Sequence, residues 1–159
     1  MTLRAIAARG EALIASVPIM LVLLVLRIAL AVPFFRSGLT KWDAPFVLAP
    51  SQFFLFGQEF RLHILGNAFP YPFPTIAAYL AATGEIVLPI LLVLGLGTRF
   101  AALGILVMTA VIQLTVPEGW ANFHLPWAAM ALALMAYGGG RLSADGWLAG
   151  NPDLAGAHR

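Results

Sequence analysis

The chain contains no cysteine. This absence excludes disulfide bonds, thiolate metal sites and any thiol-exchange reaction carried out by the chain itself. Charged residues are also scarce, at 10% of the chain, whereas soluble domains carry about 25%. The net charge is only +2, and Lys and Arg form no run. Nothing in the composition therefore favours a nucleic-acid partner, and we expect none.

Hydrophobic residues, in contrast, make up 61% of the 159 residues, which is typical of an integral membrane protein. Four apolar segments approach the roughly 20 residues that a helix needs to cross a bilayer. We therefore expect an all-α fold, an integral membrane bundle of four transmembrane helices within residues 17–138. The predicted spans are residues 18–35, 76–96, 100–116 and 123–137, and the last is short.

The segments outside the spans predict three further features. Residues 1–16 are mildly amphipathic and predict an interfacial segment. Residues 36–75 form a long outer loop, in which residues 51–65 have near-helical apolar spacing and predict an amphipathic loop helix between the first two spans. Residues 139–159 predict a polar cytoplasmic tail. The first span resembles a signal peptide, but its length and an internal arginine favour a retained anchor.

The distribution of basic residues predicts the orientation. Four spans place both termini on one side of the membrane. Cytoplasmic segments carry an excess of Lys and Arg, and five basic residues against three favour cytoplasmic termini in a bacterial inner membrane. The five are Arg4, Arg9, Arg99, Arg141 and Arg159, and the three are Arg36, Lys41 and Arg61.

Two charges interrupt the predicted spans. Arg27 lies in the middle of the first span, and Glu85 lies in the middle of the second. A charged side chain at the bilayer centre costs about 2.5–3.5 kcal/mol on insertion scales, so such charges are usually paired. Because both residues are central in neighbouring spans, we expect Arg27 and Glu85 to meet as an ion pair. The pair either lines a ligand site or only holds two helices in register.

Other polar residues are candidate ligand contacts. Thr109 and Gln113 lie four residues apart in the third span, and they either bond a neighbouring helix or bind a ligand such as a quinone carbonyl. Arg36 and Lys41 follow the first span, and they either anchor in lipid headgroups or close an outer mouth over a ligand. The candidate ligand-binding residues are thus Arg27, Glu85, Thr109, Gln113, Lys41 and Arg36.

Two histidines on the predicted outer side are weak candidates for metal ligands. His63 lies in the long loop and His124 at the start of the fourth span. Imidazole suits several transition metals, but His63 has no second histidine three or four residues away. We therefore expect no metal site.

Several elements together resemble the DoxX family of small bacterial membrane proteins. They are Arg27, residues 36–41 (corresponding to the family's G-x-x-K element), Glu85, and residues 95–102. The resemblance implies a four-helix membrane bundle and a loose association with redox systems, since some members are subunits of thiosulfate:quinone oxidoreductases or partners of antioxidant enzymes. The fold looks similar to that of vitamin K epoxide reductases, but those enzymes use cysteines, which this chain lacks.

Three functions remain open from the sequence. The first is a quinone- or lipid-binding accessory subunit of a redox-linked membrane system, with a redox protein as partner. The second is a non-enzymatic membrane anchor or assembly partner for another protein. The third is a transporter of small solutes or metal ions, which would require a homo-oligomer. No nucleophile–base pair or phosphate loop is recognisable, so the isolated chain is not expected to be an enzyme; if it takes part in catalysis, it is an oxidoreductase subunit.

Overall fold

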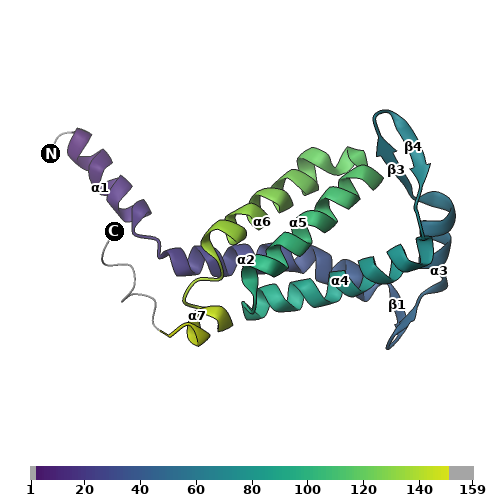
Figure 1. The fold of residues 1–159 in the computed structure, drawn as a ribbon. Coiled ribbons are helices and arrows are strands. Elements are labelled where there is room, and N and C mark those ends of the chain that lie inside the picture. Colours follow the sequence, from purple (N-terminus) through teal and green to yellow (C-terminus); the bar gives the residue numbers. More distant parts are fainter. Residues whose placement is uncertain (1–2, 151–159) are drawn as a thin grey trace.

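A computed structural model describes residues 3–150 of the chain. Four helices pack side by side, and two short hairpins and a short helix cover one end of the bundle (Figure 1). The bundle helices are α2 (Ile19–Leu39), α4 (Pro74–Leu94), α5 (Thr98–Thr115) and α6 (Leu125–Tyr137).

Three of these helices are long and apolar enough to cross a membrane, within the described part of the chain. They are α2 and α4, with 21 residues each, and α5, with 18. At 1.5 Å per residue these lengths correspond to about 27–32 Å, close to the thickness of the hydrocarbon core. The prediction of membrane spans is confirmed for these three, although α2 continues to Leu39, beyond the predicted end of the first span at Phe35.

The fourth predicted span is shorter than the others. α6 has 13 residues, or about 20 Å of helix, and is preceded by a 3₁₀ turn, Pro117–Gly119, and a π-helical turn, Trp120–His124. A crossing by α6 alone would need a thinned bilayer, so the fourth span stays a prediction.

The long loop differs from the prediction of one helix over residues 51–65. Helix α3 (Pro50–Phe54) continues into a π-helical turn (Leu55–Glu59), and then the backbone becomes extended. Strands β3 (Arg61–Ile64) and β4 (Asn67–Pro70) pair as an antiparallel hairpin. Its two-residue turn consists of Leu65 and Gly66, which both have positive φ angles, as tight hairpin turns require.

A second hairpin lies earlier in the same loop. Strands β1 (Trp42–Ala44) and β2 (Val47–Leu48) pair directly after α2. The fold is therefore helical with two small hairpins rather than strictly all-α. Short paired strands satisfy the backbone hydrogen-bonding groups of this loop internally, which a segment close to the membrane requires.

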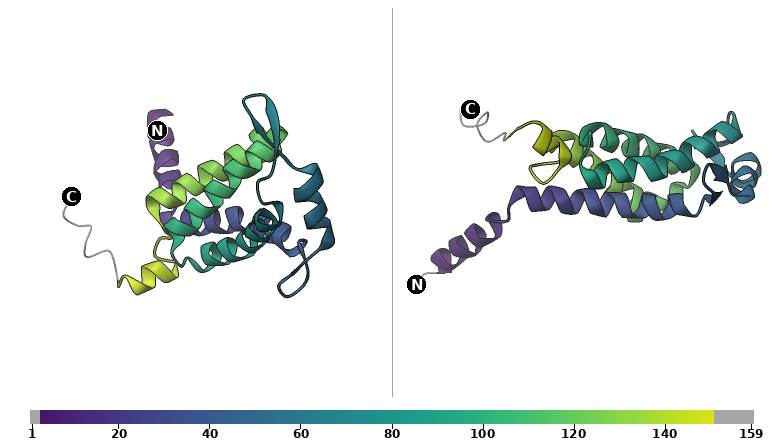
Figure 2. Two further views of the ribbon diagram at one scale, coloured as in Figure 1. Left: turned by 45° about the vertical axis from the view of Figure 1, so that its right-hand side comes forward. Right: turned by 90° about the horizontal axis from the view of Figure 1, so that it is seen from below.

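The remaining helices lie at the other end of the bundle. Helix α1 (Leu3–Ala15) stands apart from the bundle, and α7 (Ala144–Leu148) lies at the same end (Figure 2). The opposite end carries the hairpins and α3. The two ends of the molecule thus differ: the hairpins and α3 lie at one end, and α1 and α7 lie at the other.

Glycines allow the bundle helices to approach closely. A Cβ atom on Gly38 of α2 would lie 2.9 Å from the main-chain carbon and oxygen of Glu85 on α4. On the other side of α4, a Cβ on Gly104 of α5 would lie 2.9 Å from the Leu88 side chain. In lipid no hydrophobic driving force brings helices together, so they associate by close packing, which small residues at the contacts allow.

We predict that Gly38→Ala lowers the stability of the bundle by about 1–3 kcal/mol, because the added methyl group collides with the backbone of α4. Gly57→Ala is the matched control, since a Cβ there meets no atom within 4 Å. The measurement is thermal unfolding of both variants in the same detergent. Equal melting temperatures for the two variants would contradict the close α2–α4 contact.

Candidate functional site

Arg27 and Glu85 do not form the expected ion pair. The Arg27 guanidinium donates hydrogen bonds to the carbonyl oxygens of Leu92 (3.2 Å) and Val93 (3.0 Å), near the end of α4, and to that of Leu142. Glu85 instead pairs with Lys41, whose Nζ lies 2.7 Å from Glu85 Oε2. The predicted single charged pair is therefore two separate polar centres.

The cause is the stagger between α2 and α4. Gly38, near the C-terminal end of α2, lies against Glu85, so the end of α2 is level with the middle of α4. Arg27 is then level with Leu92, seven residues or about 10 Å farther along α4. Central positions in two spans imply equal depth only if the spans are aligned, and these are not.

The Arg27 centre joins the C-terminal segment to the bundle. Asp145 of α7 accepts hydrogen bonds from the backbone N–H groups of Gly97 (2.7 Å) and Thr98 (2.8 Å) at the start of α5. These groups have no partner within their own helix, so Asp145 caps α5 from a distant part of the chain. Arg27 caps the last carbonyls of α4 in the same region. Residues 139–148 of the predicted tail thus include a structural part, and residues 151–159 lie outside the described residues.

The pKa of Asp145 reflects this environment. Burial acts to raise the pKa, but the hydrogen bonds from Thr98 and Gly97 and the charge of Arg27 outweigh burial and hold the pKa below its ordinary value of 3.8. A carboxyl whose pKa is lowered by folding stabilises the folded protein above its unfolded pKa. That stabilisation is lost as the pH falls through the lower, folded-state pKa.

The second centre lies beside a cavity of about 510 Å³. The cavity is bordered by the end of α2, the π-helical turn before β3, α4, α5 and Trp127 of α6. Lys41 and Glu85 are its charged residues, and both are largely buried. Lys41 also donates a hydrogen bond to Ser37 Oγ (2.9 Å), four residues earlier on α2. The sequence predicted Lys41 and Glu85 as ligand contacts but not that they would meet.

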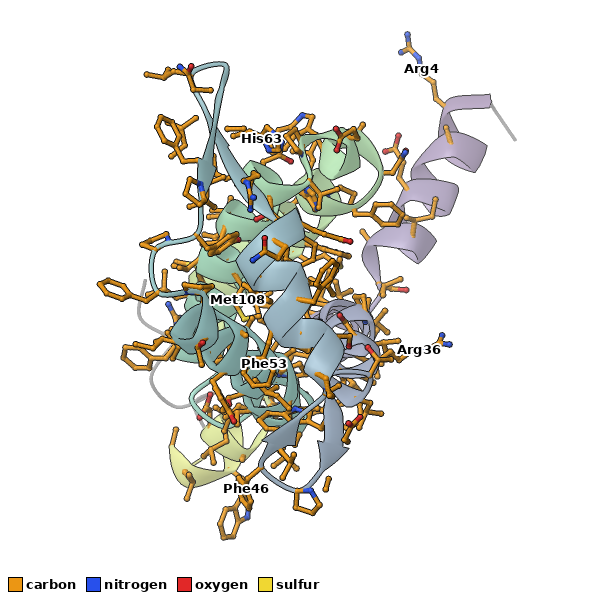
Figure 3. All side chains as sticks on the ribbon, turned by 90° about the vertical axis from the view of Figure 1, so that its right-hand side faces the viewer. Arg4, Arg36, Phe46, Phe53, His63 and Met108 are labelled. Atoms are coloured by element: carbon orange, nitrogen blue, oxygen red, sulfur yellow. The ribbon has the colours of Figure 1, made fainter. Side chains whose placement is uncertain are left out.

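The other predicted contacts lie elsewhere. Arg36 points away from the bundle (Figure 3) and borders a smaller groove of about 280 Å³ on the outside of α2 and α4. Thr109 is buried, and its hydroxyl donates to the carbonyl of Ile105 on its own helix (2.8 Å). Gln113 Oε1 accepts a hydrogen bond from His124 Nδ1 (2.6 Å). Gln113 thus bonds a neighbouring segment, as one of its two interpretations expects, whereas Thr109 bonds only its own helix.

The two histidines have structural partners. His63 Nδ1 lies 3.1 Å from the carbonyl oxygen of Leu114, so the β3–β4 hairpin rests on the end of α5. His124 contacts Gln113 and packs beside Trp127. Within residues 3–150 no group of three or more His, Cys, Asp or Glu side chains is arranged to hold a metal ion.

Sequence reasoning missed several residues of the two centres. Ser37 precedes Lys41 by one helical turn, and this i, i+4 spacing could have indicated their contact. Asp145 has no such local signal, because its partners lie about 50 residues earlier in the chain. The missed residues are Ser37, Tyr71, Thr115 and Trp127 at the cavity and Asp145 at the Arg27 centre.

The chain is similar to a known protein family and to a protein from another organism. The sequence profile of the DoxX family matches residues 22–118. A protein of Haemophilus influenzae described only as uncharacterized is 33% identical over 135 residues, which is 77% of this chain and 80% of the relative. No solved structure matches the chain at a comparable level of significance.

We predict that Asp145→Ala destabilises the protein at neutral pH by about 0.5–2 kcal/mol, the usual value of a helix cap. The difference from the wild type should shrink as the pH falls from 3.8 toward the lower pKa of folded Asp145, because the unfolded state takes up a proton first in this range. Asp43→Ala, at an exposed position, is the control and should have no such effect. Thermal unfolding between pH 7 and pH 3 measures the difference, and a pH-independent difference would contradict a charged cap.

Proposed function

The chain belongs to the DoxX family, and we propose that it binds a quinone in the cavity beside Lys41 and Glu85, as an accessory subunit of a redox-linked system in the bacterial inner membrane. The observation that carries the proposal is the cavity itself, which combines largely apolar walls with a single charged region. The interpretation of the termini as cytoplasmic belongs to the same proposal.

The size of the cavity suits a small organic ligand. Ligand sites are typically clefts of about 300–1,000 Å³ with mostly apolar walls and a few well-placed polar groups. This cavity has about 510 Å³. Its apolar walls come from residues of α4 and α5 such as Leu80 and Val111, and its polar groups converge from α2 and α4.

The polar groups suit a carbonyl oxygen. An ammonium group has three N–H donors. Lys41 directs one toward Ser37 and one toward Glu85, which leaves a third for a ligand oxygen. A hydrogen bond from a charged donor contributes about 1.5–3 kcal/mol, enough to orient a quinone ring within apolar walls.

Glu85 has two roles in this proposal. Its carboxylate pairs with the Lys41 ammonium inside the membrane, where an unpaired charge is costly. It also borders the cavity and could exchange a proton with the ligand. Reduction of a quinone to a quinol takes up two electrons and two protons, and the cysteine-free chain has no thiols to supply the electrons. The proposal therefore includes a partner redox protein as the electron donor.

An alternative is that the chain anchors or assembles another protein. The observation that favours it is the pair of hairpin turns, where Phe46 and Leu65 are exposed and have positive φ angles. The tight turns account for this backbone conformation, and the exposed apolar side chains at their tips would give a partner protein two points of contact. The double variant Phe46→Ser and Leu65→Ser should then lose a co-purifying partner while retaining quinone binding, and an unchanged set of partners would exclude this alternative.

For the main proposal, we predict that Lys41→Met weakens quinone binding about tenfold to a hundredfold, because the ligand oxygen loses a charged donor. Arg36→Met is the matched control: it removes a charge near the same end of α2, but from a side chain that points away from the bundle, and should change binding less than twofold. Binding is measured as radiolabelled quinone retained by the purified protein in lipid nanodiscs. Absence of binding by the wild type, or equal effects of the two substitutions, would overturn the proposal.

A further inference from the structure

We infer that the quinone reaches this cavity sideways from the hydrocarbon layer, through an opening between α4 and α5, and that its hydrophobic tail remains in that opening. The inference rests on the proposed function and adds to it the class of ligand, a tailed and membrane-dissolved quinone, and the route of entry. It is carried by the walls of the cavity, three of which are closed by side-chain contacts.

The first closed wall lies where α4 and α5 touch. A Cβ on Gly84 of α4 would lie 2.9 Å from the sulfur of Met108 on α5, and a Cβ on Gly104 of α5 would lie 2.9 Å from Leu88. Met108 also borders the cavity. The two helices are therefore in close contact between the cavity and their shared turn, and they leave no room for a ligand there.

The second closed wall lies on the side of the long loop. The Tyr71 hydroxyl and Thr115 Oγ1 are 2.5 Å apart and join the loop to the end of α5. The Phe56 ring lies edge-on against Tyr71 and against Phe60, with 5.2 Å between the ring centres in each case. This aromatic cover, made of Phe56, Phe60 and Tyr71, separates the cavity from the loop side.

The third closed wall lies at the centre of the bundle. Trp127 of α6 borders the cavity and packs against Phe34 of α2, with ring centres 4.9 Å apart. Lys41 and Glu85 complete this wall and are held together at 2.7 Å. The charged region is thus at the inner side of the cavity, remote from the lipid.

The remaining side faces outward between α4 and α5. Leu80 of α4 and Val107 and Val111 of α5 border the cavity, yet 69%, 56% and 40% of their surfaces are exposed. Both helices are candidate membrane spans, so these surfaces would face hydrocarbon rather than water. Figure 1 shows that α4 and α5 diverge from their shared turn toward the end that carries the hairpins. We call the gap bordered by Leu80, Val107 and Val111 the lateral opening.

This arrangement selects a ligand with two unlike ends. A polar head that accepts a hydrogen bond from Lys41 fits the inner wall, and an apolar chain fits an opening whose borders are Leu and Val. A ligand dissolved in the hydrocarbon layer enters without passing through water, so its tail is never exposed to water. A water-soluble ligand of the same head chemistry would gain nothing from an apolar opening.

The test compares Val107→Trp, which narrows the lateral opening, with Val87→Trp as matched control. Val87 is an exposed valine on α4 that does not border the cavity. Each variant, in lipid nanodiscs, is titrated with dimethoxy-methyl-benzoquinone without a tail and with its decyl-tailed form. We expect Val107→Trp to weaken binding of the tailed quinone at least tenfold and to change binding of the tail-less quinone less than twofold. Val87→Trp should change neither.

The other outcomes are decisive as well. If Val107→Trp leaves both affinities unchanged, or lowers both equally, the tail does not pass through the lateral opening and the inference is overturned. If the wild type binds neither quinone, the proposed function itself fails. Weaker binding of the tailed quinone by Tyr71→Trp, with no effect of Val107→Trp, would place the route at the aromatic cover instead and also overturn the inference.

Discussion

The Lys41–Glu85 ion pair is the interaction on which the rest of this structure depends. A carboxylate near the middle of a membrane-spanning helix is stable only with a partner, and loss of one member of a buried pair typically costs about 3–5 kcal/mol. The partner must arrive at the depth of Glu85, so α2 has to end there, at Leu39, with Lys41 in the turn that follows. The N-terminal half of α4 then packs against the long loop, where Ala78 and Ala82 share a buried cluster with Leu48 and Phe56. The cavity exists because α2 ends beside the middle of α4 and does not continue along it.

The two polar centres divide structural and chemical roles. At the Arg27 centre the charged side chains bind backbone groups: Arg27 caps the end of α4, and Asp145 caps the start of α5. Gly95 has a left-handed φ of 69°, and a Cβ there would lie 2.4 Å from the Arg27 guanidinium, so both the turn and the arginine require glycine at this position. At the Lys41–Glu85 centre, in contrast, the charged groups border open space. The first centre therefore fixes the helices, and the second is the one available to a ligand.

The sequence predicted the parts of this fold that depend on local composition. The three long apolar helices α2, α4 and α5 follow from hydrophobic length, and the importance of Arg27 and Glu85 follows from the cost of charge in a membrane. The pairing of these charges could not be predicted, because it depends on the stagger of α2 against α4, which Gly38 allows and which leaves no periodic signal. The end of α2 was misplaced for a related reason: Arg36 looks like the end of a span, but an exposed arginine can extend to the membrane surface from within a helix. The β3–β4 hairpin was missed because its residues have helical apolar spacing, and only Gly66 indicated a turn.

Lys41 offers the most direct test of the account, since it is the single lysine of the chain. Protein labelled with ¹⁵N-lysine therefore has one side-chain ammonium signal, which reports on the charged wall of the cavity alone. When decyl-tailed benzoquinone is added to the labelled protein in nanodiscs, the account predicts that this signal shifts in proportion to the quinone bound. It also predicts that Glu85→Gln displaces the signal in the absence of quinone, because the ammonium loses its carboxylate partner. A signal that stays unchanged while quinone binds would contradict the central claim that Lys41 and Glu85 form the polar end of the ligand site.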